Sequence, residues 1–258
     1  MSALDVAAEW FAVEPCEHDV TRIYEPHVDP YLASNAWLVR GTERDALLDT
    51  GTGIARLRPV VEELTERPVL ALALNCLYDH AGSLHEFDTR GLHRLDAQGM
   101  AHPTPESSLS AAYVSDAMLR ALPESGYTTA AYALRPAPAT EVFEDGDEIT
   151  LGGRRLRVLH LPGWTAGSMG IWEEKTELLF TSDTLYDDAQ FVVKQDDEPP
   201  YADAAGLADS LARLRQFPVS MVHGGHFESF GRERMIELID GWLDSHAGPA
   251  TAQTAARR

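Results

Sequence analysis

Four short apolar runs in the sequence each end in a cluster of aspartate, histidine or glycine. The runs with their polar ends are LLDTGTG at 47–53, NCLYDHAG at 75–82, LLFTSDTLY at 178–186 and VHGGHF at 222–227. Apolar runs of this length are typical of buried strands, and α/β folds usually place their chemistry beyond the carboxyl ends of strands. The sequence therefore predicts an α/β chain whose reactive side chains lie at strand ends.

The first third of the chain has the pattern of strands, one helix and a further strand. Short runs with β-branched or aromatic residues at 21–24, 35–41 and 45–51 are followed by Gly or Pro, which favours strands. Residues 55–64 place apolar side chains at helical spacing, and the run at 68–75 predicts a buried strand.

The middle of the chain predicts a cover over the site and a second sheet. Residues 100–140 are rich in Ala, Ser and Pro with helical periodicity, so we expect a helical cover. The stretch 145–163 predicts a hairpin with a Gly-Gly turn, and 168–174 and 177–183 predict two more short strands. These closely spaced strands and turns indicate a sheet that is mostly antiparallel.

The last third predicts two helices around one strand. An amphipathic helix is expected at 203–217, a buried strand at 219–225 and a final helix at 233–243. We find no linker composition and no repeat period, and therefore expect a single domain over 1–246. Residues 247–258 are small, polar and patternless, which predicts a flexible tail.

Composition narrows the class of protein. The chain has 258 residues, of which 44% are hydrophobic, and a formal net charge of -20. That charge repels phosphate backbones and anionic membranes. We therefore expect a small-molecule substrate and neither nucleic acid nor a membrane as partner, with a homodimer left open. No apolar run approaches the roughly 18 residues of a membrane span and the N-terminus is acidic, which favours a cytoplasmic protein.

Five segments, in this order and spacing, resemble the metallo-β-lactamase superfamily. LLDTGTG at 47–53 is similar to the family's early Asp-x-Gly turn, and NCLYDHAG at 75–82 is similar to its HxHxDHxG motif. LPGWTAGS at 161–168 stands where the family has PGHTxGS, 178–186 where a strand ends in a metal-bridging Asp, and 222–227 where the last His lies. The resemblance covers nearly the whole chain and implies a four-layer αββα sandwich, with two mixed sheets flanked by helices.

The resemblance also implies a site for two metals, of which one half has lost its ligands. The three histidine positions of the first metal carry Asn75, Leu77 and Trp164. Random decay would rarely remove every ligand that belongs to one metal alone and spare the whole set of the other. We therefore interpret the sequence as half of a binuclear site that is still chemically sufficient.

All ligands of the second metal are present. They are Asp79, His80 and His226, with Asp183 in the bridging position. Two imidazoles and two carboxylates can hold one divalent metal; zinc is our first expectation, with iron or manganese as alternatives. Asp79 or Asp183 could also accept a proton during catalysis. A hydrogen-bonded network without metal is the plainer alternative, and Asp49 is expected to fix its loop rather than to bind metal.

The substituted positions are candidates for a substrate pocket. Leu77 and Trp164 either plug the vacated site or form an apolar wall against a substrate group. The amide of Asn75 could hold a water or a substrate carbonyl. His160 and Tyr186 are further pocket candidates, for which a packed histidine and a buried structural tyrosine are the plainer interpretations.

One metal on this fold predicts hydrolysis by Lewis-acid catalysis. The expected substrate is a small ester, lactone, thioester or amide; phosphodiesters are disfavoured because two metals are not available to clamp both oxygens. Two other classes stay open. One is a non-hydrolytic metal enzyme, such as a lyase, isomerase or iron oxygenase, and the other is a non-catalytic, ligand-binding module on the same fold. A mononuclear metallo-hydrolase is our prediction.

Overall fold

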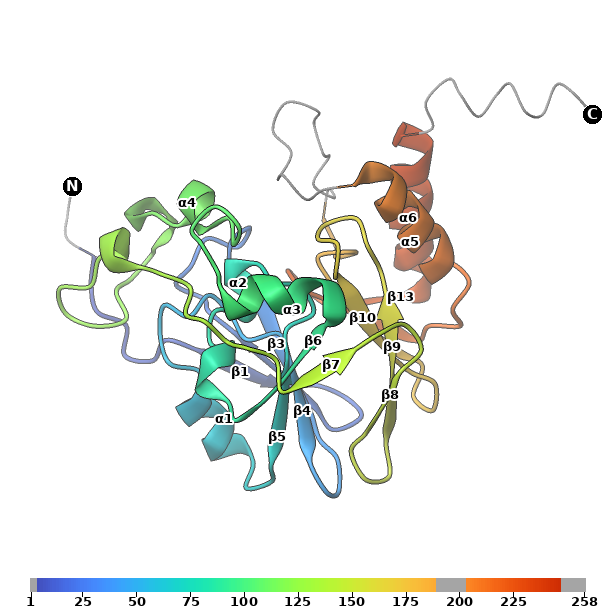
Figure 1. Cartoon of the computed structure of the whole chain (residues 1–258), viewed down its shortest axis with the longest axis horizontal. Coiled ribbons are helices and arrows are strands. Elements are labelled where there is room, and N and C mark those ends of the chain that lie inside the picture. Colours follow the sequence, from blue (N-terminus) through green and yellow to red (C-terminus); the bar gives the residue numbers. More distant parts are fainter. Residues whose placement is uncertain (1–3, 189–202, 247–258) are drawn as a thin grey trace, which may run out of the picture.

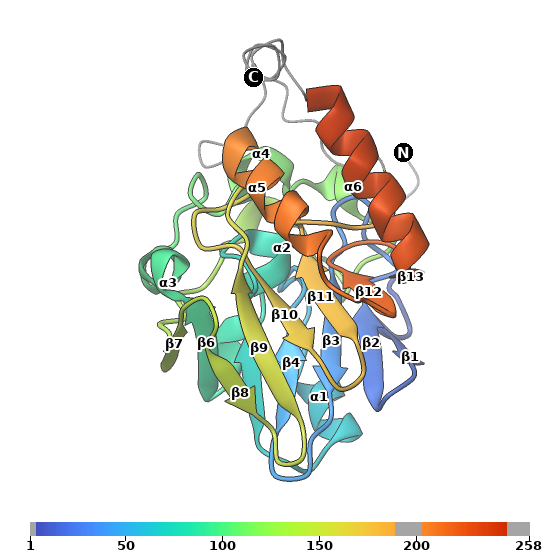
Figure 2. The ribbon, with the colours of Figure 1, turned by 90° about the vertical axis from the view of Figure 1, so that its right-hand side faces the viewer.

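Two β-sheets packed face to face form the centre of the molecule in a computed structural model that describes residues 4–188 and 203–246 (Figure 1). Helices lie on the outer face of each sheet, which gives the layers helix, sheet, sheet, helix (Figure 2). The predicted four-layer αββα fold class is thus confirmed. The predicted tail at 247–258 lies outside the described residues.

The first sheet has seven strands in sequence order. Its first four strands are antiparallel, and β4 to β7 run parallel. The strands are β1 (Ala12–Pro15), β2 (Val20–Tyr24), β3 (Asn35–Val39), β4 (Asp45–Leu48), β5 (Val69–Leu72), β6 (Thr89–His93) and β7 (Glu141–Phe143).

The second sheet has six strands in the order β13-β12-β11-β10-β9-β8. Only β11 and β12 pair in parallel, so this sheet is mostly antiparallel, as predicted. The strands are β8 (Glu148–Thr150), β9 (Arg155–His160), β10 (Met169–Glu173), β11 (Leu178–Ser182), β12 (Met221–Gly224) and β13 (Phe230–Gly231). The Gly-Gly turn between β8 and β9 has both glycines in the left-handed region that such a turn requires.

Helices cover the two outer faces. α1 and α3 lie against the first sheet, and α5 and α6 lie against the second (Figures 1 and 2). The short α2 follows β5 and carries part of the candidate site. The helices are α1 (Arg58–Leu64), α2 (Tyr78–Ala81), α3 (Arg94–Ala101), α4 (Ser110–Tyr113), α5 (Ala204–Leu214) and α6 (Arg232–His246).

Strand β3 shows how the sequence pattern produces these layers. Trp37 and Val39 face the core between the sheets, whereas Ala36 and Leu38 face the outer layer. Successive strand residues point to opposite faces, so a strand that is apolar at four successive positions, 36 to 39, must be covered on both sides. Burial of each large side chain contributes about 1.5–3 kcal/mol, which favours this four-layer arrangement.

The predicted helical cover at 100–140 is corrected by the structure. Beyond the end of α3, the segment contains only the four-residue α4 and two short 3₁₀ turns, at Asp116–Met118 and Thr129–Ala131. Leu109, just before α4, lies in the left-handed region at φ 60°, and the Asp116 carboxylate accepts hydrogen bonds from the Thr129 amide and hydroxyl. The left-handed backbone at Leu109 and the bonds from Asp116 to a residue 13 positions later both interrupt the helix that the periodicity predicted.

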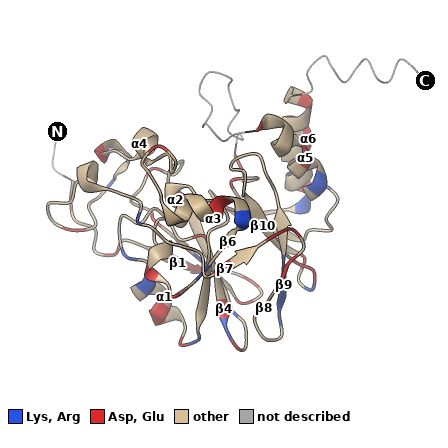
Figure 3. Ribbon diagram, viewed as in Figure 1, with Lys and Arg blue, Asp and Glu red and all other residues tan. Residues whose placement is uncertain are grey.

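The surface of the molecule carries most of its charge. Charged residues lie mainly on the helices and on loops at the ends of the sheets (Figure 3). Within the described ranges, no helix is both long and apolar enough to cross a membrane.

One end of the sandwich gathers the strand ends that the sequence singled out. The Met169 amide at the start of β10 donates to the Leu74 carbonyl just after β5, at 2.8 Å, and so joins the two sheets. The Gly225 amide after β12 donates to the Ser182 carbonyl of β11 at 2.9 Å. These backbone bonds fix the loops after β5, β11 and β12 beside one another.

Candidate metal centre

Four side chains from three strand ends converge on one point. Asp79 and His80 lie on α2 after β5, Asp183 follows β11 and His226 follows β12. The Nε2 atom of His80 lies 3.1 Å from Asp183 Oδ1 and 3.5 Å from Asp79 Oδ2. The Nε2 atom of His226 lies 3.0 Å and 3.6 Å from the same two oxygens. The structure thus brings together all four residues predicted as ligands.

The spacing of these donors suits a single metal ion. Ligands 2.0–2.1 Å from a tetrahedral zinc lie about 3.3 Å from one another. The four distances between imidazole nitrogens and carboxylate oxygens, 3.0 to 3.6 Å, bracket that value. Among the described residues, the set whose donor atoms all lie within 4.8 Å of one another is Asp79, His80 and His226; Asp183 approaches the two imidazoles but is not part of that set. The Nε2 atom of His80 is buried without a well-aligned hydrogen-bond partner among the described residues. An orphaned imidazole nitrogen between two carboxylates is a position that a cation satisfies.

The other nitrogen of each imidazole is already bonded. His226 Nδ1 lies 3.0 Å from the carbonyl oxygen of Ala33, which can only accept, so Nδ1 carries the proton. His80 Nδ1 lies 2.8 Å from Asp49 Oδ2 and donates in the same way. These contacts fix the ring orientation and leave both Nε2 lone pairs directed at the cluster, as metal-binding histidines require.

Asp49 connects the early turn to the cluster. Its Oδ1 accepts from the Leu74 amide at 2.8 Å, as expected for a residue that fixes its loop. Its Oδ2 accepts from Ser182 Oγ at 2.8 Å in addition to His80. Asp49 and Ser182 both occupy the left-handed region, at φ 61° and 47°, a backbone conformation that non-glycine residues adopt at a cost of about 1 kcal/mol or more. The one hint of Ser182 in the sequence is its position immediately before Asp183.

Asn75 orients Asp183 instead of facing a substrate. Its Nδ2 donates to Asp183 Oδ2 at 2.8 Å and to Ser182 Oγ at 3.2 Å, and its Oδ1 accepts from the Leu77 amide at 2.9 Å. The amide therefore uses its hydrogen-bonding capacity inside the site. Because Oδ2 of Asp183 is held in this way, Oδ1 points at the two imidazoles.

The electrostatics of the cluster favour an added cation. Burial raises the pKa of Asp79. Burial opposes a charge on His80, but the nearby Asp183, Asp79 and Asp49 hold its pKa well above the usual range. Burial likewise opposes ionisation of Asp183, yet His80 and His226 lower its pKa. Three carboxylates gather around the two imidazoles, and this excess of carboxylates is balanced either by protons, as the raised pKa values of Asp79 and His80 indicate, or by a divalent ion.

The vacated half of the site is narrow and largely apolar. Leu77 and Trp164 line a cavity of about 30 Å³ together with Asp79, Asp183 and His226. A volume on this scale has room for only one or two water molecules. The remaining wall is aromatic and aliphatic, and consists of Tyr31, Leu32, Tyr78, Leu109 and Tyr113. The sequence did not single out these five residues as pocket candidates: Tyr78 lies on α2 between the motif positions, and the other four come from a loop after β2 and from the cover segment.

The two other predicted pocket residues have different surroundings. Tyr186 is 3% exposed, and its ring centroid lies 5.3 Å from that of His226. His160 stacks on His93 with ring centroids 4.1 Å apart, and its Nε2 donates to the Ala166 carbonyl. The structure therefore places Tyr186 against the cluster and His160 in a separate histidine pair.

A buried carboxylate that the sequence did not reveal ties the site loops together. Asp96 of α3 accepts from the Cys76 amide at 3.1 Å, from Thr165 Oγ1 at 2.7 Å and from the Gly167 amide at 2.8 Å. It thereby joins the loop that contains Leu77 to the loop that contains Trp164. In the sequence, nothing distinguishes Asp96 from an ordinary polar residue of an amphipathic helix.

Comparison with known proteins identifies the family. The model of the metallo-beta-lactamase superfamily matches residues 29–226. The chain belongs to the metallo-beta-lactamase superfamily. This confirms the resemblance seen in the five sequence segments.

Similar proteins of this superfamily cover almost the entire chain. The human acyl-coenzyme A thioesterase MBLAC2 is 30% identical over 258 residues, which cover 94% of this chain and 90% of the relative. The chicken protein of the same name is 29% identical over 255 residues, which cover 94% of this chain and 89% of the relative. The solved metallo-beta-lactamase from Pontibacter korlensis superposes with a TM-score of 0.62 at 16% identity, over 89% of this chain and 99% of that one. The solved metallo-beta-lactamase IND-7 superposes with a TM-score of 0.63 at 15% identity, over 91% of this chain and 100% of that one.

These findings establish the broad class of enzyme, namely a hydrolase. Solved structures of such low identity support the fold alone, whereas the family and the curated relatives confirm the prediction of a hydrolase. Metallo-beta-lactamase superfamily members generally bind divalent metals, typically zinc. In the part of the chain that the structure describes, Asp79, His80 and His226 present donor atoms within 4.8 Å of one another, in agreement with a metal-binding hydrolase.

Proposed function

We propose that the protein is a metal-dependent thioesterase that holds one divalent ion. Zinc is the expected metal, with iron or manganese as alternatives. One observation carries the proposal. Asp79, His80 and His226 present donor atoms within 4.8 Å of one another and Asp183 Oδ1 lies 3.0–3.1 Å from both imidazoles, while the positions of the other metal site hold groups that do not converge. The thioester bond is suggested by the curated relatives, which are named acyl-coenzyme A thioesterases and match 94% of this chain.

A second ion has too few ligands on this chain. Leu77 has no donor atom, and the amide of Asn75 is bonded to Asp183 and to the Leu77 backbone. Trp164 carries only an indole N–H, which is a donor of hydrogen bonds and not a metal ligand. Of the first site's set, only the shared Asp183 remains, and one carboxylate does not hold a divalent ion.

The residues around the ion have separate roles in the proposed reaction. A bound divalent ion would lower the pKa of a water and polarise the thioester carbonyl. Asp79 lines the cavity and is therefore placed to accept a proton from the attacking water. Asp183 is held in orientation by Asn75. Leu77 and Trp164 keep the cavity narrow and apolar, which leaves room for the attacking water and not for bulk solvent.

Thiol release from acyl-coenzyme A tests this function. We expect the purified protein to release free thiol, to lose the activity on chelation and to regain it on addition of zinc. Asp79→Asn should be inactive, and the control Asp88→Asn should be active because the Asp88 side chain is 90% exposed on the surface. Lactone and simple ester substrates are assayed in parallel. Metal-dependent cleavage of these esters with no cleavage of thioesters would overturn the thioesterase assignment.

A further inference from the structure

Three consecutive residues at the start of β3 bond to both segments that carry Asp79 and His226. They are Ala33, Ser34 and Asn35, of which Ser34 and Asn35 are each 1% exposed. β3 belongs to the first sheet, whereas His226 follows β12 of the second. These three residues therefore join the two sheets beside the metal centre. We call them the 33–35 clamp.

Asn35 holds the loop of His226 by its backbone carbonyls. The Asn35 backbone amide donates to the Gly225 carbonyl at 2.7 Å. Its side-chain Nδ2 donates to the Gly224 carbonyl at 3.1 Å and to the Phe227 carbonyl at 2.8 Å. Phe227 lies in the left-handed region at φ 57°, which a residue other than glycine adopts only at a cost. The bonds from Asn35 thus hold a strained turn on both sides of His226.

Arg22 fixes the orientation of the Asn35 amide. Arg22 Nε donates to Asn35 Oδ1 at 2.8 Å. A guanidinium can only donate, so the amide oxygen must face Arg22 and the amide NH₂ group must face the loop. The Arg22 guanidinium is itself held, because it lies 4.3 Å from the ring centroid of Tyr24 and pairs with Glu228 at 2.7 Å. Both polar atoms of the Asn35 side chain are thereby used to support this loop.

Ser34 supports α2, which is too short to satisfy its own carbonyls. The last four carbonyls of a helix have no intrahelical partner, and α2 has only four residues. The Asp79 carbonyl accepts a hydrogen bond from Ser34 Oγ. The next carbonyl, that of His80, accepts from the Thr50 amide at 2.7 Å. The backbone of both ligands on α2 is thus held by residues outside the helix.

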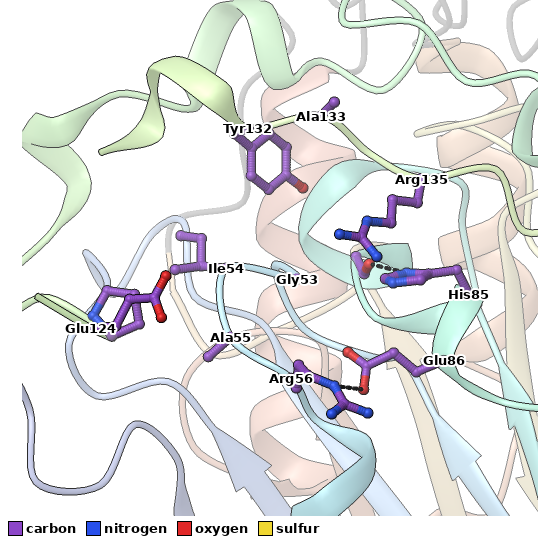
Figure 4. A pocket seen from close by; sticks show the side chains of 12 residues that line it. Gly53, Ile54, Ala55, Arg56, His85, Glu86, Glu124, Tyr132, Ala133 and Arg135 are labelled. Carbon is purple, nitrogen blue, oxygen red and sulfur yellow. Dashed lines mark hydrogen bonds and ion pairs between the residues drawn. The ribbon is translucent and has the colours of Figure 1, made fainter. Parts of the chain in front are cut away.

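The end of α2 borders a cavity instead of packed side chains. Gly82, which follows the helix, and His85 line a cavity of about 390 Å³ together with Gly53 (Figure 4). Packing cannot fix the helix on that side. The position of Asp79 therefore depends more strongly on the hydrogen bonds that its backbone accepts.

The clamp holds one ligand of each sheet from adjacent positions. The Ala33 carbonyl accepts from His226 Nδ1 at 3.0 Å, while Ser34 holds the backbone of Asp79. Asp79 Oδ2 and His226 Nε2 lie 3.6 Å apart. Because these two ligands come from different sheets, their separation depends on the contacts that join the sheets here, and the clamp supplies such contacts.

We propose that Ser34 and Asn35 are positioning residues of the metal centre, which set the separation of Asp79 and His226 and thereby the affinity for the ion. This inference rests on the proposed single-metal site, but it concerns metal binding and not the bond that is cleaved. The side chains of Ser34 and Asn35 act through the backbone of the segments that carry the ligands. Loss of such an outer contact typically lowers metal affinity by about 10–100-fold.

Chelator competition on two folded variants tests this role. Ser34→Ala removes the hydroxyl, and Asn35→Asp keeps the oxygen that faces Arg22 but loses both Nδ2 donors. We expect zinc affinity to fall by about tenfold or more in each variant, with one equivalent still bound. Cobalt(II) in place of zinc should show a changed visible absorption spectrum in both, because this spectrum reports the arrangement of the ligands. Wild-type zinc affinity in either folded variant would overturn the role of that residue.

Ser210→Ala is the matched control for a purely structural effect. Ser210 is 4% exposed, and its hydroxyl donates to the Pro162 carbonyl at 2.7 Å, in a loop without a proposed ligand. This variant should lose stability much as Ser34→Ala does, measured with chelator present, yet keep wild-type zinc affinity and the wild-type cobalt spectrum. An equal loss of zinc affinity in Ser210→Ala would show that affinity merely follows stability, and would overturn the inference.

These measurements need no substrate, so they separate the inference from the proposed function. A protein that binds zinc as predicted but releases no thiol from acyl-coenzyme A would overturn the thioesterase activity alone. A protein that hydrolyses thioesters while both variants keep wild-type zinc affinity would overturn the clamp alone. A wild-type protein that binds no zinc would overturn both.

Discussion

The two halves of the metal cleft differ in how their side chains are used. In the half with Asp79, His80 and His226, the donor atoms turn inward and each imidazole is held from behind, by Asp49 or by a backbone carbonyl. In the half with Asn75 and Leu77, the one polar side chain bonds to its neighbours and the other is apolar. The comparison teaches that a metal site depends on the outer contacts of its ligands as much as on the ligands.

Asp183 stands between the two halves and, in the proposed mononuclear site, has a different partner at each of its carboxylate oxygens. A carboxylate that bridges two cations needs a positive partner at each oxygen. Here Oδ1 faces the two imidazoles and Oδ2 accepts from Asn75 Nδ2 at 2.8 Å. The amide N–H thus takes the place of the missing cation. We infer that Asn75 is a positioning residue for Asp183, which accounts for a polar residue at one of the three substituted positions.

The largest expected effect comes from the imidazoles. His80→Ala and His226→Ala should each abolish metal retention and lower activity by more than about 100-fold, because loss of a ligand exceeds the 10–100-fold cost of losing an outer partner. Leu77→Ala, from the other half, should retain the metal. Elemental analysis of folded protein, checked by circular dichroism, gives the result. Equal loss of metal in all three variants would remove the distinction between the halves.

Restoring the first half is the next test. The triple variant Asn75→His/Leu77→His/Trp164→His should take up a second zinc, since three imidazoles beside Asp183 rebuild a complete ligand set. Leu77 is 3% exposed, so its replacement by a polar ring should cost about 3 kcal/mol.

Zinc titration of a demonstrably folded triple variant is the measurement. A folded protein that binds no second ion would mean that the loops at 75–80 and 162–167 do not have the geometry of a binuclear site. Loss of native activity despite zinc uptake would show that Leu77 and Trp164 serve as a substrate wall and are not a simple plug.

Weakening an outer contact should have a smaller effect. Asp49→Asn leaves an oxygen for the Leu74 amide but removes the charge that holds His80 and Ser182. We expect metal affinity to fall by about 10–100-fold, with the stoichiometry unchanged. Competition with a zinc chelator measures the affinity. An Asp49→Asn protein with wild-type affinity would contradict the importance given to outer contacts.

The smallest effect concerns a histidine outside the cleft. His223 packs between Trp37 and Phe180, and burial lowers its pKa to about 4. Because the unfolded pKa is about 6.5, the unfolded chain takes up this proton first, and stability is lost as the pH falls from 6.5 toward 4. The loss attributable to His223 is on the order of 2–3 kcal/mol.

Denaturant unfolding between pH 7 and 4, with chelator present so that metal release does not contribute, checks this loss. His223→Gln should show a shallower decline over the same range. An equally steep decline in the variant would assign the acid sensitivity to other groups.

The sequence predicted the layers because they leave local marks, and the polar ends of the strands marked the four candidate ligands. Runs such as 36–39 in β3, apolar at successive positions, require cover on both faces. Asp183 follows β11 directly, and Asp79 and His80 lie on α2, the first helix after β5. The helical cover was overpredicted, since the Asp116 carboxylate binds backbone and side chain of a distant threonine.

Contacts between segments that are far apart in the sequence could not be predicted from local sequence patterns. Asp96 lies in a helix whose pattern gives no sign of its bonds to Cys76, Thr165 and Gly167.

The central claim is one metal per chain, held by the half that kept its ligands. Metal content of protein purified without chelator, measured by inductively coupled plasma mass spectrometry against protein concentration, tests it most directly. We predict one equivalent of a divalent metal per chain, with zinc as the expected metal. The His80→Ala variant should lose this metal. Two tightly held ions per chain would contradict the account, and so would no metal after reconstitution with zinc.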